Sequence, residues 1–234
     1  MIEFINGLCL FLIYLIPAAM IMLIVRKCIK IPDELFRKIL HFILLGAYIP
    51  LLFGFYTWWK SIILVGSLVI LLFPTLLLVG KIPGFSSFVN ERKKGEFTSS
   101  MVLALSVMIL SISIGCVIFN DRFFVLASVY AWGVGDAFAA LIGKRFGKHK
   151  IKWKFVDNKK SYEGSIAMII TSTISVFIVL LIKGGINPIY ALIIALVAST
   201  ASTFVELCSK NGIDTITCPS IAMTIIVPLL MLGA

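Results

Sequence analysis

The stretch FFVLASVYAWGVGDAFAALIGKRFGKHK, residues 123–150, decides the class of fold. Its apolar part, residues 123–143, contains one charged residue, Asp136, and a dense basic cluster follows at once. A helix needs about 20 apolar residues to cross about 30 Å of hydrocarbon at about 1.5 Å per residue. The stretch therefore predicts a membrane-spanning helix that carries a carboxylate near one end.

The rest of the chain repeats this apolar pattern. Of its 234 residues, 60% are hydrophobic and 14% are charged, and its mean hydropathy is +1.09, which is far from the usage of a soluble domain. We predict an all-α polytopic membrane bundle that forms a single domain over residues 1–234, with seven or eight transmembrane helices. The apolar windows are 4–25, 39–55, 61–79, 101–119, 123–143, 165–182, 188–207 and 218–233.

The basic residues predict how this bundle is oriented. If the loops alternate between the two sides, Lys60, Arg122 and Lys183 fall on one side and the other 18 of the 21 basic residues fall on the opposite side. By the positive-inside rule the basic side is cytoplasmic and both termini lie outside. The net charge of +10 is then explained by topology, and we expect no nucleic-acid partner.

The acidic residues gather on the same side, which no topology rule requires. All but Glu3 and Asp121 belong to the predicted cytoplasmic face. Acids, bases and glycines on one face indicate a site for a polyanion and a metal. We expect a multi-pass protein of the cell membrane in a prokaryote, or of the endoplasmic reticulum in a eukaryote, with its active face cytoplasmic.

Small residues surround Asp136. On a helix, Gly133, Asp136, Ala140 and Gly143 share one face, which favours close approach by a neighbouring helix or by a ligand. One interpretation is a helix-packing seam in which Asp136 is hydrogen-bonded to another helix. A carboxylate within a span costs about 2.5 to 3.5 kcal/mol at the bilayer centre, however, and by default marks a functional site.

Two known phosphate-binding motifs are excluded in this region. GKRFGKH is one residue short between its glycines for a Walker A loop, and His149 stands where Ser or Thr should bind magnesium. GVGDAF departs from the dinucleotide fingerprint because Phe138 occupies the third glycine position.

A second cluster, KKSYEGS, covers residues 159–165 before the sixth apolar window. Ser161, Glu163 and Ser165 can cap the start of a helix. A helix N-terminus also presents free N–H groups and a partial positive charge, so this cluster can cradle a phosphate group. The two interpretations are compatible.

Three further patches lie on the predicted cytoplasmic face. RKILH places Arg37 and Lys38 at the membrane edge and His41 one turn into the second window, although a lone histidine is more often a packed residue. ERKKGEF, residues 91–97, is typical of a solvated loop. Glu206 and Asp214 supply carboxylates that are either metal ligands or partners for lysines.

In this order, the patches resemble the polyprenol kinase family, which includes dolichol kinase, phytol kinase and the CTP-dependent diacylglycerol kinase. The matching segments are RKILH (37–41), GDAFAALIGKRFGK (135–148), KSYEGS (160–165), Glu206 and DTITCP (214–219). The chain departs from the family in one place, since Thr215 stands where the family has Asn. The resemblance implies transfer of the γ-phosphoryl group of a nucleoside triphosphate, typically CTP, to the hydroxyl of a membrane lipid, with Mg²⁺ or another divalent cation.

The resemblance and the charge pattern together assign the site, whose partners would be a lipid alcohol, the nucleotide and the bilayer. The expected catalytic residues are Asp136, Glu163 and His41, and the expected metal ligands are Asp136, Glu206 and Asp214. The expected nucleotide-binding residues are Arg37, Lys38, Gly135, Gly143, Lys144, Arg145, Gly147, Lys148, Lys160, Ser161, Gly164, Ser165 and Thr217.

Two other functions compete with a lipid kinase. A cytidylyltransferase that makes a CDP-lipid would use the same inputs but would release pyrophosphate instead of CDP. A transporter is the alternative from another class. Transporters place ionisable groups near the midplane at broken helices in paired repeats, whereas here the polar groups gather at one end and no repeat is visible.

Overall fold

The computed structural model describes residues 2–82, 84–85, 89, 91, 95–153, 156, 160–209 and 212–232. The secondary structure of these residues is helical, apart from one isolated antiparallel bridge between Lys150 and Ser161. Eight segments are long and apolar enough to cross a membrane, and α2 and α3 together form one of them. The predicted all-α class is confirmed, and the chain is consistent with a multi-pass membrane protein. The helices are α1 (Ile2–Cys28), α2 (Asp33–Gly46), α3 (Tyr48–Phe53), α4 (Trp58–Val79), α6 (Glu96–Ile118), α7 (Arg122–Phe146), α8 (Tyr162–Lys183), α9 (Pro188–Cys208) and α10 (Asp214–Leu232).

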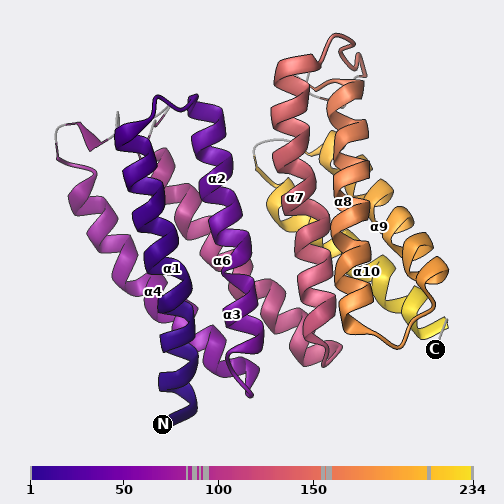
Figure 1. Cartoon of the computed structure of the whole chain (residues 1–234), viewed down its shortest axis with the longest axis horizontal. Coiled ribbons are helices and arrows are strands. Elements are labelled where there is room, and N and C mark those ends of the chain that lie inside the picture. The colour runs from indigo at the N-terminus through magenta and orange to yellow at the C-terminus, as the bar shows by residue number, and fades with distance from the viewer. Residues whose placement is uncertain are drawn as a thin grey trace.

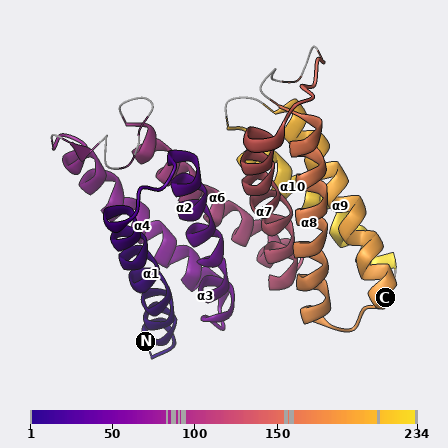
Figure 2. The same cartoon turned by 45° about the horizontal axis from the view of Figure 1, so that its top comes forward.

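The helices form two groups that lie side by side (Figures 1 and 2). The first group contains α1, α2, α3, α4 and α6, and within it α6 packs mainly on α4. The second contains α7 to α10, in which α7 packs most extensively on α8, and α10 packs on both α7 and α9. The two groups meet where α2 and α6 contact α7. One apolar core, which includes Leu45, Ile112, Val125 and Ile194, runs through both groups.

Local sequence signals explain where several helices begin and end. Asp121 caps α7 by accepting a hydrogen bond from Phe123 N at 2.8 Å, and Asn187 caps α9 by accepting one from Ile189 N at 2.9 Å. Ser161 caps α8, as the sequence predicts, by accepting from Gly164 N at 3.3 Å. The break between α2 and α3 comes just before Pro50, which has no N–H to donate to the carbonyl four residues earlier.

Charged residues occupy both ends of the bundle, but in different ways. At the end that holds both termini (Figure 1), the three bases predicted for the outer side have local partners. Lys60 pairs with Glu3, Lys183 pairs with Asp121, and Arg122 donates to a backbone carbonyl. The opposite end carries most of the charge, and its assignment to the cytoplasm stays a prediction. The residues predicted at that end that lie outside the described part of the chain are Arg92, Lys93, Lys94, Lys154, Asp157, Lys159 and Lys210.

Candidate functional site

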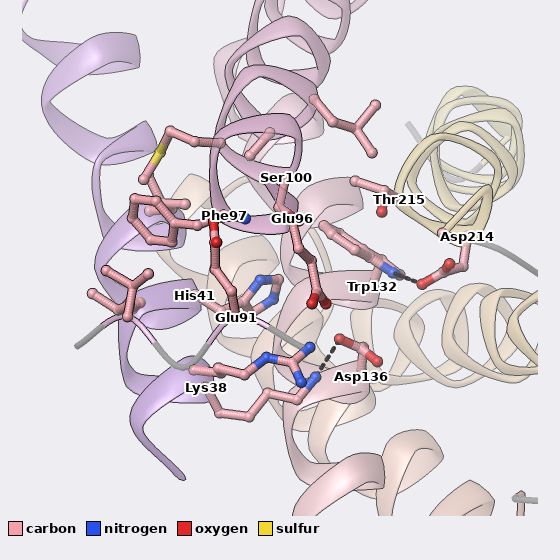
Figure 3. Close-up of a pocket in the computed structure, with 18 residues that line it drawn as sticks. Lys38, His41, Glu91, Glu96, Phe97, Ser100, Trp132, Asp136, Asp214 and Thr215 are labelled. Atoms are coloured by element: carbon pink, nitrogen blue, oxygen red, sulfur yellow. Dashed lines mark hydrogen bonds and ion pairs between the residues drawn. The ribbon is translucent and has the colours of Figure 1, made fainter. Parts of the chain in front are cut away.

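A cavity of about 320 Å³ lies at the charged end, between the two groups of helices (Figure 3). Helices α2 and α6 line it from one side, and α7 and the start of α10 line it from the other. The segment before α6 contributes Val89 and Glu91. The polar and aromatic residues that line the cavity are Arg37, Lys38, His41, Glu91, Glu96, Phe97, Ser100, Trp132, Asp136, Asp214 and Thr215.

Asp136, the carboxylate within α7, faces this cavity and does not face lipid. Its Oδ2 lies 2.8 Å from Lys38 Nζ of α2, so an ion pair joins the two groups of helices. The side chains of Lys38 and Asp136 are only 14% and 22% exposed. His41 and Lys160 also lie within electrostatic reach of the Asp136 carboxylate. An opposite charge at contact distance explains how this span accommodates a carboxylate.

A chain of aromatic and polar contacts connects α2, α7 and α10 around the cavity. His41 Nε2 lies 3.0 Å from the carbonyl oxygen of Gly133. Because a carbonyl oxygen can only accept a hydrogen bond, Nε2 carries a proton and Nδ1 is the acceptor of the neutral ring. The His41 ring packs edge-on against Trp132 at 5.2 Å, and Trp132 Nε1 donates to Asp214 Oδ2 at 3.3 Å. The start of α10 is thereby fixed to α7 beside Asp136.

The predicted metal ligands do not converge on one point. In the part of the chain that the structure describes, no three His, Cys, Asp or Glu side chains form a cluster that could hold a metal ion. Asp136 and Asp214 line the cavity, whereas Glu206 lies outside its lining but within electrostatic reach of both. Mg²⁺ is commonly held by one or two carboxylates together with substrate phosphates, so two carboxylates on a cavity wall fit an ion that arrives with a nucleotide.

The atoms of these two carboxylates support that fit. Among the described residues, Asp136 and Asp214 each receive their protein hydrogen bond through Oδ2. Within the described part of the chain, no hydrogen bond engages Oδ1 of either carboxylate. Magnesium binding stays a prediction.

Lys160 and Glu206 form a second ion pair near the cavity. Lys160 Nζ lies 2.8 Å from Glu206 Oε1, and it also donates to the backbone carbonyl of Glu206. The pair joins the residue before α8 to the end of α9, and neither residue lines the cavity. In this structure Lys160 holds two helices together beside Asp136.

The glycines predicted to bind nucleotide lie in the contact between α7 and α8. A Cβ on Gly164 would lie 3.0 Å from the Ala139 carbonyl oxygen and 3.3 Å from Gly143 Cα. A Cβ on Gly135 would collide with the Ser172 hydroxyl. The packing seam, which was one of the two interpretations of these small residues, is thus present. A nucleotide-binding role for the glycines stays a prediction.

Glu163 ties the end of α7 to the start of α8. Its carboxylate accepts hydrogen bonds from the backbone N–H groups of Lys148 at 3.2 Å and His149 at 3.1 Å, and it contacts His149 Nδ1 at 2.7 Å. Tyr162 N donates to the His149 carbonyl at 3.1 Å, and Gly164 N donates to Ser161. These first-turn amides have partners within the chain, and Glu163 lies outside the cavity lining.

The other predicted phosphate-binding residues divide between the cavity and the surface. Arg37 and Lys38 line the cavity. Three bases lie on exposed positions at the end of α7 and just beyond it, and two hydroxyls bond to their own helices. Lys144 pairs with Glu34 at 3.4 Å, Arg145 stacks over Phe146 at 5.2 Å, and Gly147 and Lys148 follow them along the chain. Ser165 Oγ donates to the Ser161 carbonyl at 3.1 Å, and Thr217 Oγ1 donates to the Ile213 carbonyl at 3.1 Å.

Sequence reasoning missed several cavity residues. Trp132 precedes Asp136 by four residues, and this spacing on one helix face was the signal that could have found it. Glu96 belongs to the segment interpreted as a solvated loop, yet its carboxylate points into the space above Asp136 (Figure 3). Thr215, the residue at which the chain departs from the polyprenol kinase pattern, also lines the cavity.

The comparisons with known proteins identify the family of the chain. A sequence model of the cytidylyltransferase family matches residues 2–209, so the chain belongs to that family. Membership indicates an enzyme that acts on a lipid substrate with a nucleotide. No curated protein and no solved structure matches the chain. The matched range includes every described lining residue of the cavity except Gly212, Asp214 and Thr215.

Proposed function

We propose that this protein is a lipid kinase that transfers the γ-phosphoryl group of CTP to the hydroxyl of a membrane lipid alcohol, such as a polyprenol, a phytol-type isoprenoid or diacylglycerol. One observation carries the proposal. Separate helices bring Lys38, Asp136 and Asp214 to a single cavity at one end of the bundle. A lipid hydroxyl lies at that depth in a membrane, and a nucleotide reaches it from the adjacent solution.

The reaction needs positioned charge more than covalent chemistry. The lipid hydroxyl oxygen would attack the γ-phosphorus, the bond from the γ-phosphorus to the β–γ bridging oxygen would break, and CDP would leave. Arg37 and Lys38 would contact the phosphate oxygens, where fixed cations stabilise the developing charge. Asp136 and Asp214 would hold Mg²⁺, which would neutralise the phosphates when bound. His41 would accept the hydroxyl proton on Nδ1, and Asp136 would stabilise the imidazolium that forms.

The charge of the cavity favours a neutral acceptor. Among its described lining residues the permanent cations are Arg37 and Lys38, and Lys38 is already paired with Asp136. A nucleotide with Mg²⁺ would already use those cations. A lipid phosphate acceptor would add about 1.5 to 2 further negative charges to the same space, because a phosphate monoester has a second pKa of about 6. A lipid alcohol adds none.

Formation of a CDP-lipid is the second candidate, and membership of the cytidylyltransferase family favours it. That reaction would join the α-phosphorus of CTP to a lipid phosphate and release pyrophosphate. The two reactions therefore leave different phosphorus atoms on the lipid.

Labelled CTP distinguishes the two candidates. Purified protein in lipid nanodiscs would be incubated with Mg²⁺, a panel of lipid alcohols and phosphatidic acid, and CTP labelled on either the α- or the γ-phosphorus. The kinase predicts that the γ-label moves to a lipid alcohol and that CDP is released. Transfer of the α-label to phosphatidic acid with release of pyrophosphate would replace the proposal with the second candidate.

A further inference from the structure

A second cavity of about 240 Å³ lies between α6 and α10, in the part of the bundle away from the charged end. On α6, Ser100 and Ala104 line the first cavity, and Val107, Ser111 and Ile118 line the second. These residues, with Ile114, follow one another at spacings of four and three, so they share one face of the helix. The two cavities therefore lie along one continuous face.

Helix α10 shows the same continuity. Asp214 and Thr215 line the first cavity, and the next residue, Ile216, begins the lining of the second. Pro219 and Met223 continue it along the helix. From Ser100 to Ile118 the shared face is about 27 Å long at about 1.5 Å per residue. This length nearly equals the hydrocarbon thickness of a bilayer, about 30 Å.

The second cavity, here called the α6–α10 groove, offers an apolar surface to a ligand. Its hydroxyl groups have partners within the protein. Ser220 Oγ donates to the Ile216 carbonyl at 2.8 Å, and Thr224 Oγ1 donates to the Ile221 carbonyl at 2.9 Å. Ser111 Oγ donates to the Val107 carbonyl at 2.8 Å and lies 3.0 Å from the Tyr48 hydroxyl. The groove is partly open, because Leu110 and Ile118 are exposed whereas Val107 and Met223 are buried.

We propose that the α6–α10 groove holds the hydrocarbon chain of the lipid alcohol whose hydroxyl reacts in the first cavity. The inference rests on the proposed kinase function and adds to it where the chain lies. A lipid with its hydroxyl beside Asp136 must direct its chain toward the bilayer centre. The groove starts at Ile216, next to the cavity residue Thr215, and runs in that direction.

Two alcohols of different length distinguish binding of the hydrocarbon chain in the groove from a general effect of a substitution on helix packing. The four carbon–carbon bonds and one carbon–oxygen bond of a five-carbon alcohol, at about 1.5 Å each, span no more than about 7.5 Å, which is the rise from Thr215 to Ser220 along α10. A five-carbon alcohol therefore ends before Ser220. Because bond angles reduce the advance of an extended alkyl chain to about 1.25 Å per bond, an alcohol of about 22 carbons or more extends along the whole shared face of about 27 Å.

The test variant is Ser220→Phe, which fills the groove, and the matched control is Ser106→Phe on α6. Both serines are exposed, and each donates to the carbonyl four residues earlier at 2.8 Å, but Ser106 lines neither cavity. We expect Ser220→Phe to lower phosphorylation of the long alcohol about tenfold while changing that of the five-carbon alcohol less than about twofold. Ser106→Phe should leave both activities near wild type.

The outcomes separate the groove from the kinase function. If wild-type protein phosphorylates neither alcohol nor any other lipid alcohol, the proposed function fails. If it phosphorylates both, and Ser220→Phe behaves like Ser106→Phe or lowers both activities equally, the groove proposal is overturned. An effect of Ser220→Phe on oligomeric state alone would also overturn it and would assign the face to contact between copies.

Photolabelling of wild-type protein gives a second measurement that needs no variant. A long alcohol with a diazirine near its chain end should label α6 or α10 at groove residues such as Ile114 and Met223. An excess of the same alcohol without the diazirine should compete for this labelling. Labelling confined to other helices would contradict the proposal even if Ser220→Phe fails to fold.

Discussion

The substitution Asp136→Asn separates the charge of Asp136 from its role in packing. The amide oxygen of Asn can still accept the hydrogen bond that Lys38 Nζ now gives to Asp136 Oδ2 at 2.8 Å. A hydrogen bond to a charged group contributes about 1.5 to 3 kcal/mol, so the loss of folding stability should not exceed about 3 kcal/mol. If Asp136 holds the metal and stabilises the imidazolium of His41, activity should fall about 1,000-fold or more, equivalent to about 4 kcal/mol of transition-state stabilisation.

The partner substitution Lys38→Met should lower the folding stability more than Asp136→Asn does. It leaves a carboxylate without its cation in a site where that side chain is 22% exposed. Breaking a buried pair in this way costs about 3 to 5 kcal/mol, and exposure to the cavity should place the cost toward the lower end. The double variant Lys38→Met/Asp136→Asn should therefore be more stable than Lys38→Met alone and still inactive.

The assay combines thermal unfolding in detergent with transfer of label from CTP to a lipid alcohol. Glu3→Gln is a suitable control, because Glu3 also forms a partly buried pair with a lysine, Lys60, but at the opposite end of the bundle from the cavity. Its activity should stay within about twofold of wild type, because the substitution leaves every residue that lines the cavity unchanged. Wild-type activity in folded Asp136→Asn would refute the proposed role of Asp136.

Three further predictions follow from the contacts around the cavity. Lys160→Ala should destabilise the protein and raise the apparent KM for CTP. Adding Glu206→Gln should restore stability, because the double variant leaves no unpaired charge. Equal unfolding temperatures for the single and double variants would contradict this prediction. Thr215→Val should lower kcat/KM while Thr215→Asn preserves it, because this position lines the cavity and needs a polar group. The same kcat/KM for the two variants would remove Thr215 from the site. Chelation by EDTA should abolish activity, and Asp214→Asn should raise the Mg²⁺ concentration for half-maximal activity about tenfold, the equivalent of about 1.4 kcal/mol; an unchanged Mg²⁺ titration would exclude Asp214 as a ligand.

The sequence predicts the spans well because their signal is local. Eight apolar windows correspond to the eight spans, and the serine that caps α8 is recognisable from its neighbours. The partner of Asp136 is not predictable in this way, because Lys38 is 98 residues away and the pair forms only when α2 packs beside α7. The basic cluster after Gly143 illustrates the same limit. A phosphate-binding role for its bases stays a prediction, and the sequence does not reveal that Lys144 pairs with Glu34 on α2 or that Arg145 stacks over Phe146.

Glycine patterns are ambiguous for a related physical reason. A small residue permits close approach by either a helix or a ligand, and only the three-dimensional neighbour distinguishes them. Around Gly143 and Gly164 the neighbour is the facing helix. Glu96 was ambiguous in the opposite direction. A charged residue beside a loop is usually solvated, but the first turn of α6 directs Glu96 into the cavity.

The location of bound nucleotide tests the central claim most directly. A cryo-electron microscopy structure with Mg²⁺ and a CTP analogue that cannot transfer its γ-phosphoryl group would show where the triphosphate lies. The account predicts phosphate density in the 320 Å³ cavity beside Arg37 and Lys38, with the metal between it and the carboxylates of Asp136 and Asp214. Triphosphate bound instead on the exposed turn around Lys144 and Lys148, away from Asp136, would contradict it.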